Sequence, residues 1–208
     1  MEFTGNAKLA SFSNEYKMIL GFYDNGVECA KRSGVPKINH INEGLLILQE
    51  LGASVVTMKA FCIHPIFQDD ETCQSFVSSE TPLPLDWRAV ALAMEYRNAA
   101  NAYLCCPETD FQPNDYLPGL ILNEVKDMLI ADKVQNKKDF VTYHQGTHPR
   151  SKQLTSYFDY WLMYLQVSDK QYANLCLLID AQYPSETAYL LSSTKNAERL
   201  QQSMDELK

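Results

Sequence analysis

The chain has 208 residues, of which 46% are hydrophobic and 21% charged, a composition that excludes a disordered polymer and suits one globular domain. The formal net charge is −8 and Lys and Arg form no run, which argues against a long nucleic acid or an anionic membrane as the primary partner. The first residues lack the basic-then-apolar order of a signal peptide, and no stretch is apolar enough for a membrane span. None of the six cysteines forms a CxxC pair, so free, reduced, interior cysteines and a cytoplasmic location are expected.

Apolar residues recur at helical spacing along most of the chain. Four of them predict a helix over 41–51, and Gly52 is a fitting residue to end it. A second helix is predicted over 54–63. Because Pro65 cannot donate a hydrogen bond inside a helix, His64 is expected near the end of that helix, where its ring can leave the packed face.

The rest of the chain continues the helical pattern. Helices are predicted over 87–104 with Asp86 as N-cap, from the next loop to about Gln145 before Gly146, over 151–166, from Asp169 to Pro184, and, in polar form, in the tail from Ser185. No alternating strand pattern and no internal repeat competes with these helices. The prediction is therefore a single all-α domain over residues 1–208.

Two histidines and one carboxylate stand out as candidates for chemistry. His40 begins one predicted helix, His64 ends another and Asp132 lies within a third, so the three can meet in space. Asp132 and Asn136 are four residues apart and share a helix face. Imidazole and carboxylate suit divalent first-row cations, and an amide can hold a substrate oxygen. Singly, each also has a structural explanation, since lone histidines are usually packed or surface residues and Asp-x-x-x-Asn is common on solvated faces.

Three ordered segments give these residues a family resemblance. RSGVPKINH (32–40), FCIHPIFQDD (61–70) and LIADKVQNKKD (129–139) resemble, in this order, three motifs of the HD hydrolase domain of RelA/SpoT-type alarmone enzymes. The resemblance covers roughly residues 15–165 and leaves 166–208 as additional C-terminal helices. It implies an all-α HD-like domain and leaves no room for a synthetase or regulatory domain.

The resemblance also implies a metal site. Four side chains hold Mn²⁺ in that family, and three of them correspond to His40, His64 and Asp132 of this chain. The fourth, the aspartate of the HD pair, is replaced by Pro65, which cannot bind a metal ion. The implied site therefore has three ligands, as many catalytic metal sites do, and Mn²⁺ is expected to bind weakly or not at all.

Further positions carry the implied catalytic and substrate-binding roles. The Glu-Asp pair that activates water in the family becomes Gln68 and Asp69, so only Asp69 can serve as a base. Asp69 or Asp70 is also a possible substitute ligand. The residues implied to contact a nucleotide are Lys31, Arg32 and Asn136, with Lys37 in place of a tyrosine that shapes the family's pocket.

Two functions are consistent with these residues. The first is metal-dependent hydrolysis of a nucleotide such as guanosine tetra- or pentaphosphate, weakened by the loss of the aspartate at position 65. The second is a catalytically inactive HD-like module that neutralises or regulates a protein partner. A chance match of an unrelated helical protein is the third explanation. The shared structural prediction of the first two is that His40, His64 and Asp132 converge in one cleft.

Overall fold

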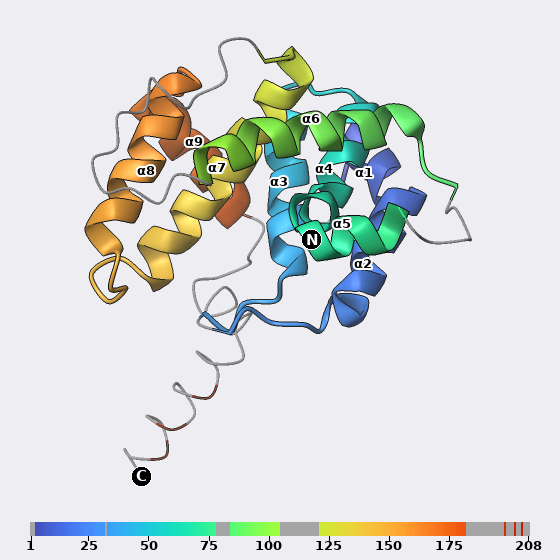
Figure 1. Ribbon diagram of the computed structural model, residues 1–208. Helices are drawn as coiled ribbons and strands as arrows, with labels where there is room; N and C mark the ends of the chain where they lie inside the picture. The colour runs from blue at the N-terminus through green and yellow to red at the C-terminus, as the bar shows by residue number, and fades with distance from the viewer. Residues whose placement is uncertain are drawn as a thin grey trace.

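The computed structural model describes residues 3–31, 33–77, 84–104 and 121–181, together with residues 198, 202 and 205. Within these ranges the chain forms nine α-helices and one short 3₁₀ turn and contains no strand (Figure 1). The helices are α1 (Gly5–Ser11), α2 (Asn14–Phe22), α3 (Ile38–Glu50), α4 (Val55–Gln68), α5 (Asp70–Val77), α6 (Trp87–Leu104), α7 (Asn123–Tyr143), α8 (Ser151–Tyr164) and α9 (Asp169–Asp180), and the turn is η1 (Asp24–Gly26). The all-α prediction is confirmed for this part of the chain.

Helices α3, α4, α6 and α7 occupy the centre of the molecule (Figure 1). α4 packs most extensively against α6, and α3 packs against α7. α1 and α2 contact α4 at one end, whereas α8 and α9 contact α7 at the other. The three helices that carry His40, His64 and Asp132 are thus brought together from distant parts of the chain.

Most of the predicted helices are present. The helix predicted over 41–51 is α3, and Gly52 follows it with a φ of +73°. Asp86 caps α6 as predicted, since its Oδ1 accepts a hydrogen bond from the Arg88 N–H at 3.1 Å. α7 ends at Tyr143, two residues before the predicted end, and α8 begins at Ser151 as predicted.

The prediction that α4 ends near His64 is wrong, because the helix continues through Pro65 to Gln68. Pro65 has no N–H for the carbonyl of Phe61, four residues earlier in the helix. The Nδ1 atom of His64 lies 2.6 Å from that carbonyl oxygen and donates to it instead. A side chain therefore supplies the donor that proline lacks, and the helix survives.

Other differences concern helix ends and short helices. Ser168 caps α9 by accepting from the Gln171 N–H, so Asp169 is the first helical residue and not the cap. The apolar pattern did not predict α1 and α2, which have only seven and nine residues. The predicted end of α9 at Pro184 and the helix from Ser185 lie outside the described residues, apart from three isolated positions.

α3 and α4 approach each other closely at Gly44. A β-carbon at this position would lie 2.1 Å from Cε1 of Phe61, so glycine is needed for the ring to rest against α3. The Phe61 ring in turn contacts the rings of His40 and His64, with centroid separations of 5.6 and 4.6 Å. The close packing of α3 and α4 thus places the Phe61 ring against both histidine rings.

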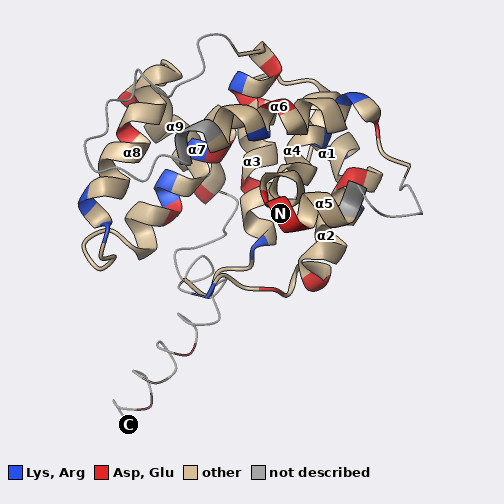
Figure 2. Ribbon diagram, viewed as in Figure 1, with Lys and Arg blue, Asp and Glu red and all other residues tan. Residues whose placement is uncertain are grey.

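Basic and acidic residues are interspersed along the helices in the ribbon of Figure 2. None of the described helices combines the length and the apolar character needed to cross a bilayer. The four described cysteines, Cys29, Cys62, Cys73 and Cys176, form no disulfide, as predicted. Only Cys62 among them is fully buried, so interior packing is confirmed for one of the four.

Candidate metal centre

His40 of α3, His64 of α4 and Asp132 of α7 converge, as predicted; we call them the histidine cluster. The Nε2 atoms of the two histidines are 3.3 Å apart. Oδ1 of Asp132 lies 3.4 Å from Nε2 of His40 and 3.8 Å from Nε2 of His64. His64 and Asp132 are buried, His40 is half-buried, and all three line one cleft.

The protonation of His64 follows from its buried neighbour. A backbone carbonyl only accepts hydrogen bonds, so Nδ1 of His64 must carry the proton that contacts Phe61 O. Burial, and then the adjacent His40, lower the pKa of His64 to about 3. The ring is therefore neutral at pH 7, and its Nε2 atom presents a lone pair to the cluster.

Gln135 of α7 orients His40 in the same way. The amide nitrogen of Gln135 donates to Oε2 of Glu43 at 3.1 Å and to Oδ2 of Asp139 at 2.8 Å. These two carboxylates fix the amide so that its oxygen faces His40, whose Nδ1 atom lies 2.7 Å away and donates to it. Nε2 is then the remaining ligand atom of His40, and it also points at the cluster.

This arrangement suits a bound cation. Two unprotonated imidazole nitrogens that face each other at 3.3 Å repel unless a proton or a metal ion lies between them. Bonds of about 2.1 Å to a metal would separate neighbouring ligand atoms by about 3.0 Å in octahedral and about 3.4 Å in tetrahedral geometry. Of the three observed separations, 3.3 and 3.4 Å are close to the tetrahedral value and 3.8 Å lies above it. Two histidines and one carboxylate therefore fit a divalent first-row metal ion.

Asp132 is ionised, but its charge is partly neutralised by Lys133. Burial alone would raise the pKa of Asp132, yet Lys133 and the two histidines outweigh it and hold the pKa at about 2. The Lys133 ammonium lies 2.6 Å from Oδ2, between the rings of Tyr157 and Trp161. Oδ2 of Asp132 is thus ion-paired with Lys133, and Oδ1 faces the two histidines. The positive charge of Lys133 reduces the attraction of the site for a cation.

A cleft of about 310 Å³ opens onto the cluster. Asn136 lines it and donates from Nδ2 to Oδ1 of Asp132 at 2.8 Å. Gln68 and Pro65 also line the cleft, as does Lys37, which is ion-paired with Glu28. Of the residues implied to act in catalysis or substrate binding, the structure thus brings Gln68 and Asn136 to the site.

The structure does not bring Asp69 to the cleft. Its Oδ2 atom accepts hydrogen bonds from the backbone N–H and the hydroxyl of Thr72, at 2.9 and 2.6 Å, at the start of α5. Asp70 is exposed and ion-paired with Arg97. The catalytic role of Asp69 stays a prediction, and in this conformation its carboxylate serves as a helix cap.

Of the two basic residues implied to contact a nucleotide, Lys31 is exposed and is not among the residues that line the cleft. Arg32 lies outside the described residues. The segment that carries them precedes α3, and its neighbours Ala30 and Ser33 do line the cleft. Lys31 therefore lies next in the chain to a residue that lines the cleft, and its contact with a ligand stays a prediction.

A buried network next to the histidine cluster was not predicted from the sequence; we call it the lysine cluster. It consists of Glu43, Gln135, Lys138 and Asp139. A signal for part of it was present, because residues 132, 135, 136 and 139 recur at i, i+3, i+4 and i+7 and share one helix face. The pairing with Glu43 of α3 depends on packing between distant segments and has no local signal.

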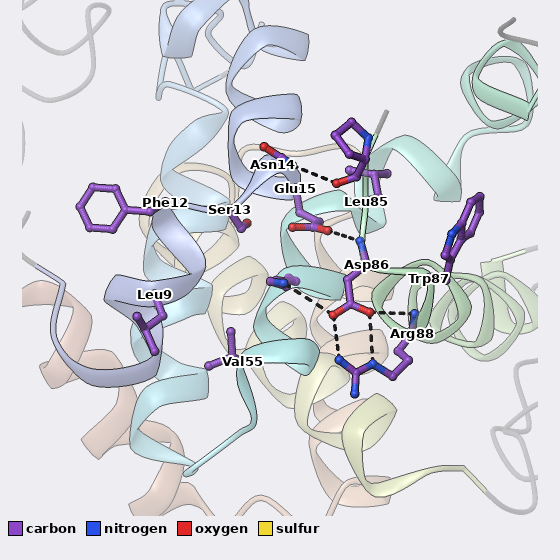
Figure 3. Close-up of a pocket in the computed structure, with 12 residues that line it drawn as sticks. Leu9, Phe12, Ser13, Asn14, Glu15, Val55, Leu85, Asp86, Trp87 and Arg88 are labelled. Carbon is purple, nitrogen blue, oxygen red and sulfur yellow. Dashed lines mark hydrogen bonds and ion pairs between the residues drawn. The ribbon is translucent and has the colours of Figure 1, made fainter. Parts of the chain in front are cut away.

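A second, larger hollow lies elsewhere on the molecule. It has a volume of about 860 Å³ and is formed where α1, α2, α4 and the start of α6 meet (Figure 3). Leu9 and Phe12 lie on one side and Trp87 on the other, and these apolar side chains are 60%, 68% and 71% exposed. Between them the buried Glu15 carboxylate accepts from the Asp86 N–H at 2.6 Å. We call this hollow the apolar groove after these three apolar side chains, although polar and charged residues such as Lys59 and Arg88 line it as well.

Comparison with known proteins assigns no family to the chain. A scan against protein-family models finds no match, and searches of curated proteins and of solved structures find none either. The likeness to HD hydrolases therefore stands on the three sequence segments alone, and the geometry adds a buried group of two histidines and an aspartate.

Proposed function

We propose that the chain is an HD-type metal-binding protein that accepts a nucleotide in its cleft and hydrolyses it weakly or not at all. The observation that carries the proposal is the convergence of His40, His64 and Asp132, with the ligand atoms within 4.8 Å of one another. These atoms come from three helices and from motifs that occur in the order found in RelA/SpoT-type hydrolases.

The residues around the cluster are better suited to bind a nucleotide than to hydrolyse it. A divalent ion held there would act as a Lewis acid on a phosphoryl oxygen. Asn136 already donates to Asp132, and its amide oxygen is suited to a ligand hydroxyl or amine. Neither of the two residues implied to activate water is suited to this role in this conformation, because Gln68 is an amide and Asp69 is held by Thr72. Binding without efficient turnover follows from this set of groups.

The first experiment measures metal. Mn, Zn, Fe and Ni are quantified in protein purified without chelator, and Zn²⁺ and Mn²⁺ are titrated into the metal-free protein by calorimetry. We expect one site per chain that is lost in His64→Ala, with weaker affinity for Mn²⁺ than for Zn²⁺ because only one carboxylate contributes. A wild-type protein that binds neither ion would contradict the proposed metal site.

The second experiment tests nucleotide binding. Guanosine tetraphosphate and GTP are titrated into the wild type and into Lys31→Ala and Asn136→Ala variants, with release of phosphate or pyrophosphate measured in parallel. We expect both substitutions to weaken binding, and slow or absent product release. Lys170→Ala is the matched control, since Lys170 is an exposed lysine on α9, away from the cleft. Equal binding by all four proteins would contradict a nucleotide role for the cleft.

The apolar groove favours a second candidate function, the binding of a protein partner. The exposed Phe12 and Trp87 side chains line the same hollow, and aromatic residues are enriched at protein interfaces. We propose that such a partner would offer an apolar segment to the groove. A partner retained by the wild type and by His64→Ala but not by Phe12→Ser or Trp87→Ser would assign the interaction to the groove; equal retention by all four would reject it.

A further inference from the structure

The interior of α4 contains a proline next to a metal-ligand candidate. An ordinary residue at position 65 would donate its N–H to the carbonyl of Phe61, as the helix repeat requires. Pro65 has no N–H, and its ring pushes against the carbonyl four residues earlier. The Phe61 oxygen is therefore left without its backbone donor in a buried part of the helix.

His64 takes the place of that donor. Its Nδ1 atom is 2.6 Å from the Phe61 oxygen, and both residues are almost completely buried, so water cannot satisfy either group. The ring plane is held by aromatic neighbours on two sides, with centroids 4.6 Å from Phe61 and 4.7 Å from Tyr96. The imidazole is thus fixed in position as well as in hydrogen bonding.

The hydrogen bond decides which nitrogen remains open. In the alternative tautomer, Nε2–H of His64 could donate to Nε2 of His40 at 3.3 Å, which would satisfy the cluster with a proton and close it to a metal. That tautomer would also set a lone pair on Nδ1 against the lone pairs of the Phe61 oxygen, which is unfavourable in a buried site.

We propose that Pro65 is a positioning residue: by removing the backbone donor to Phe61, it holds His64 in the Nδ1–H tautomer with Nε2 directed at the metal position. The inference rests on the metal site proposed above and gives the residue that replaces a ligand a role of its own. Pro65 thus provides no metal ligand itself but fixes the tautomer of the neighbouring ligand, His64.

The test reads the tautomer directly. Metal-free protein labelled with ¹⁵N-histidine is examined at pH 7.5 by long-range ¹H–¹⁵N spectroscopy, and the His64 signals are assigned by their loss in His64→Gln. We expect the wild type to show a protonated Nδ1 and an unprotonated Nε2. In Pro65→Ala the restored N–H competes for Phe61 O, so the His64 signals should shift toward a mixture of tautomers. Alanine favours a helix interior, so this variant keeps α4.

Zn²⁺ affinity provides the second measurement. Weakening of one neutral hydrogen bond should lower the affinity of Pro65→Ala by about fivefold. Pro36→Ala is the matched control, because Pro36 lines the same cleft but lies outside a helix interior and away from Phe61. It should leave the His64 signals unchanged.

The outcomes separate the two proposals. A wild type with Nε2–H, or a Pro65→Ala variant with unchanged His64 signals, would overturn the positioning role. A wild type that shows the expected tautomer and the expected shift in Pro65→Ala, yet binds no Zn²⁺, would support the positioning role and overturn the proposed metal site. A drop in affinity without a change in tautomer would also overturn the role, because the loss would then have another cause.

Discussion

The histidine cluster and the lysine cluster are neighbours and both include residues of α3 and α7, with His64 of α4 completing the first. They satisfy their buried polar groups in different ways. In the lysine cluster, Lys138 contacts Glu43 at 2.7 Å and Asp139 at 3.0 Å, and the Gln135 amide donates to both carboxylates. Each of these hydrogen-bond donors in the lysine cluster contacts an acceptor, and the Lys138 ammonium contacts two carboxylates. In the histidine cluster, two acceptor nitrogens face each other.

The difference separates a structural network from a candidate functional site. Buried polar groups are costly unless they are paired, and a protein can pair them internally or with a ligand. The lysine cluster pairs them internally, although burial still raises the pKa of Glu43 against the opposing effect of Lys138. The histidine cluster completes its pairing only with an added proton or metal ion, which is the property expected of a binding site.

The largest expected effect comes from breaking the lysine cluster. Glu43→Ala removes the carboxylate that lies 2.7 Å from the buried Lys138 ammonium, so we expect a loss of about 3 kcal/mol in the free energy of unfolding, at the low end for a broken buried pair. Urea denaturation measures it. The double variant Glu43→Met, Lys138→Met removes both buried charges and should recover much of the loss; recovery of none would show that the pair has no special importance.

Breaking the histidine cluster should change the stability little and the Zn²⁺ affinity strongly. His40→Ala removes a ligand whose side chain is 19% exposed, so the unfolding free energy should fall by only about 1 kcal/mol. Zn²⁺ affinity should fall by more than about 100-fold, because even indirect contacts to a metal site change affinity by 10- to 100-fold. His148→Ala, a histidine in an exposed turn outside the cluster, is the control. Equal Zn²⁺ affinity in wild type and His40→Ala would show that the cluster is not a metal site.

Gln135 connects the two clusters and tests whether one supports the other. Gln135→Leu removes the acceptor for His40 Nδ1 and the donor to Glu43, so His40 can rotate or change tautomer. We expect Zn²⁺ affinity to fall roughly 30-fold, within the range for residues that orient metal ligands. Thr142→Val, which removes a side-chain hydrogen bond elsewhere on α7, is the matched control. A variant that loses stability but keeps its affinity would confine Gln135 to the lysine cluster.

These clusters also show how far the sequence leads. The convergence of His40, His64 and Asp132 was predictable from the resemblance of three segments, in their order, to the motifs of one family. Helices α3 and α6 were predictable because apolar spacing, Gly52 and the Asp86 cap are local signals. Such features depend on residues close in sequence or on a recognised arrangement.

The remaining features depend on contacts between distant segments or on competition between two local rules. Pro65 was expected to end α4, but the side-chain bond from His64 to Phe61 replaced the missing backbone donor. Asp69 was assigned a catalytic role, yet its spacing to Thr72 also suits a helix cap, and the cap is what forms. Gln135 acquires its role from Glu43, 92 residues away, which no local pattern encodes.

Pro65→Asp tests whether the histidine cluster can accept a second carboxylate. Pro65 lines the cleft beside His64, so an aspartate there would add a carboxylate to the histidine cluster and offset the charge of Lys133. The same change restores the N–H that competes for Phe61 O. Because a direct ligand outweighs one neutral hydrogen bond, we expect a net gain in Zn²⁺ affinity of roughly tenfold. Pro65→Asn is the matched control, since it restores the N–H with a side chain of similar size and no charge, and its affinity should fall below wild type. Equal affinities for the two variants would mean that a carboxylate at position 65 does not reach the metal position.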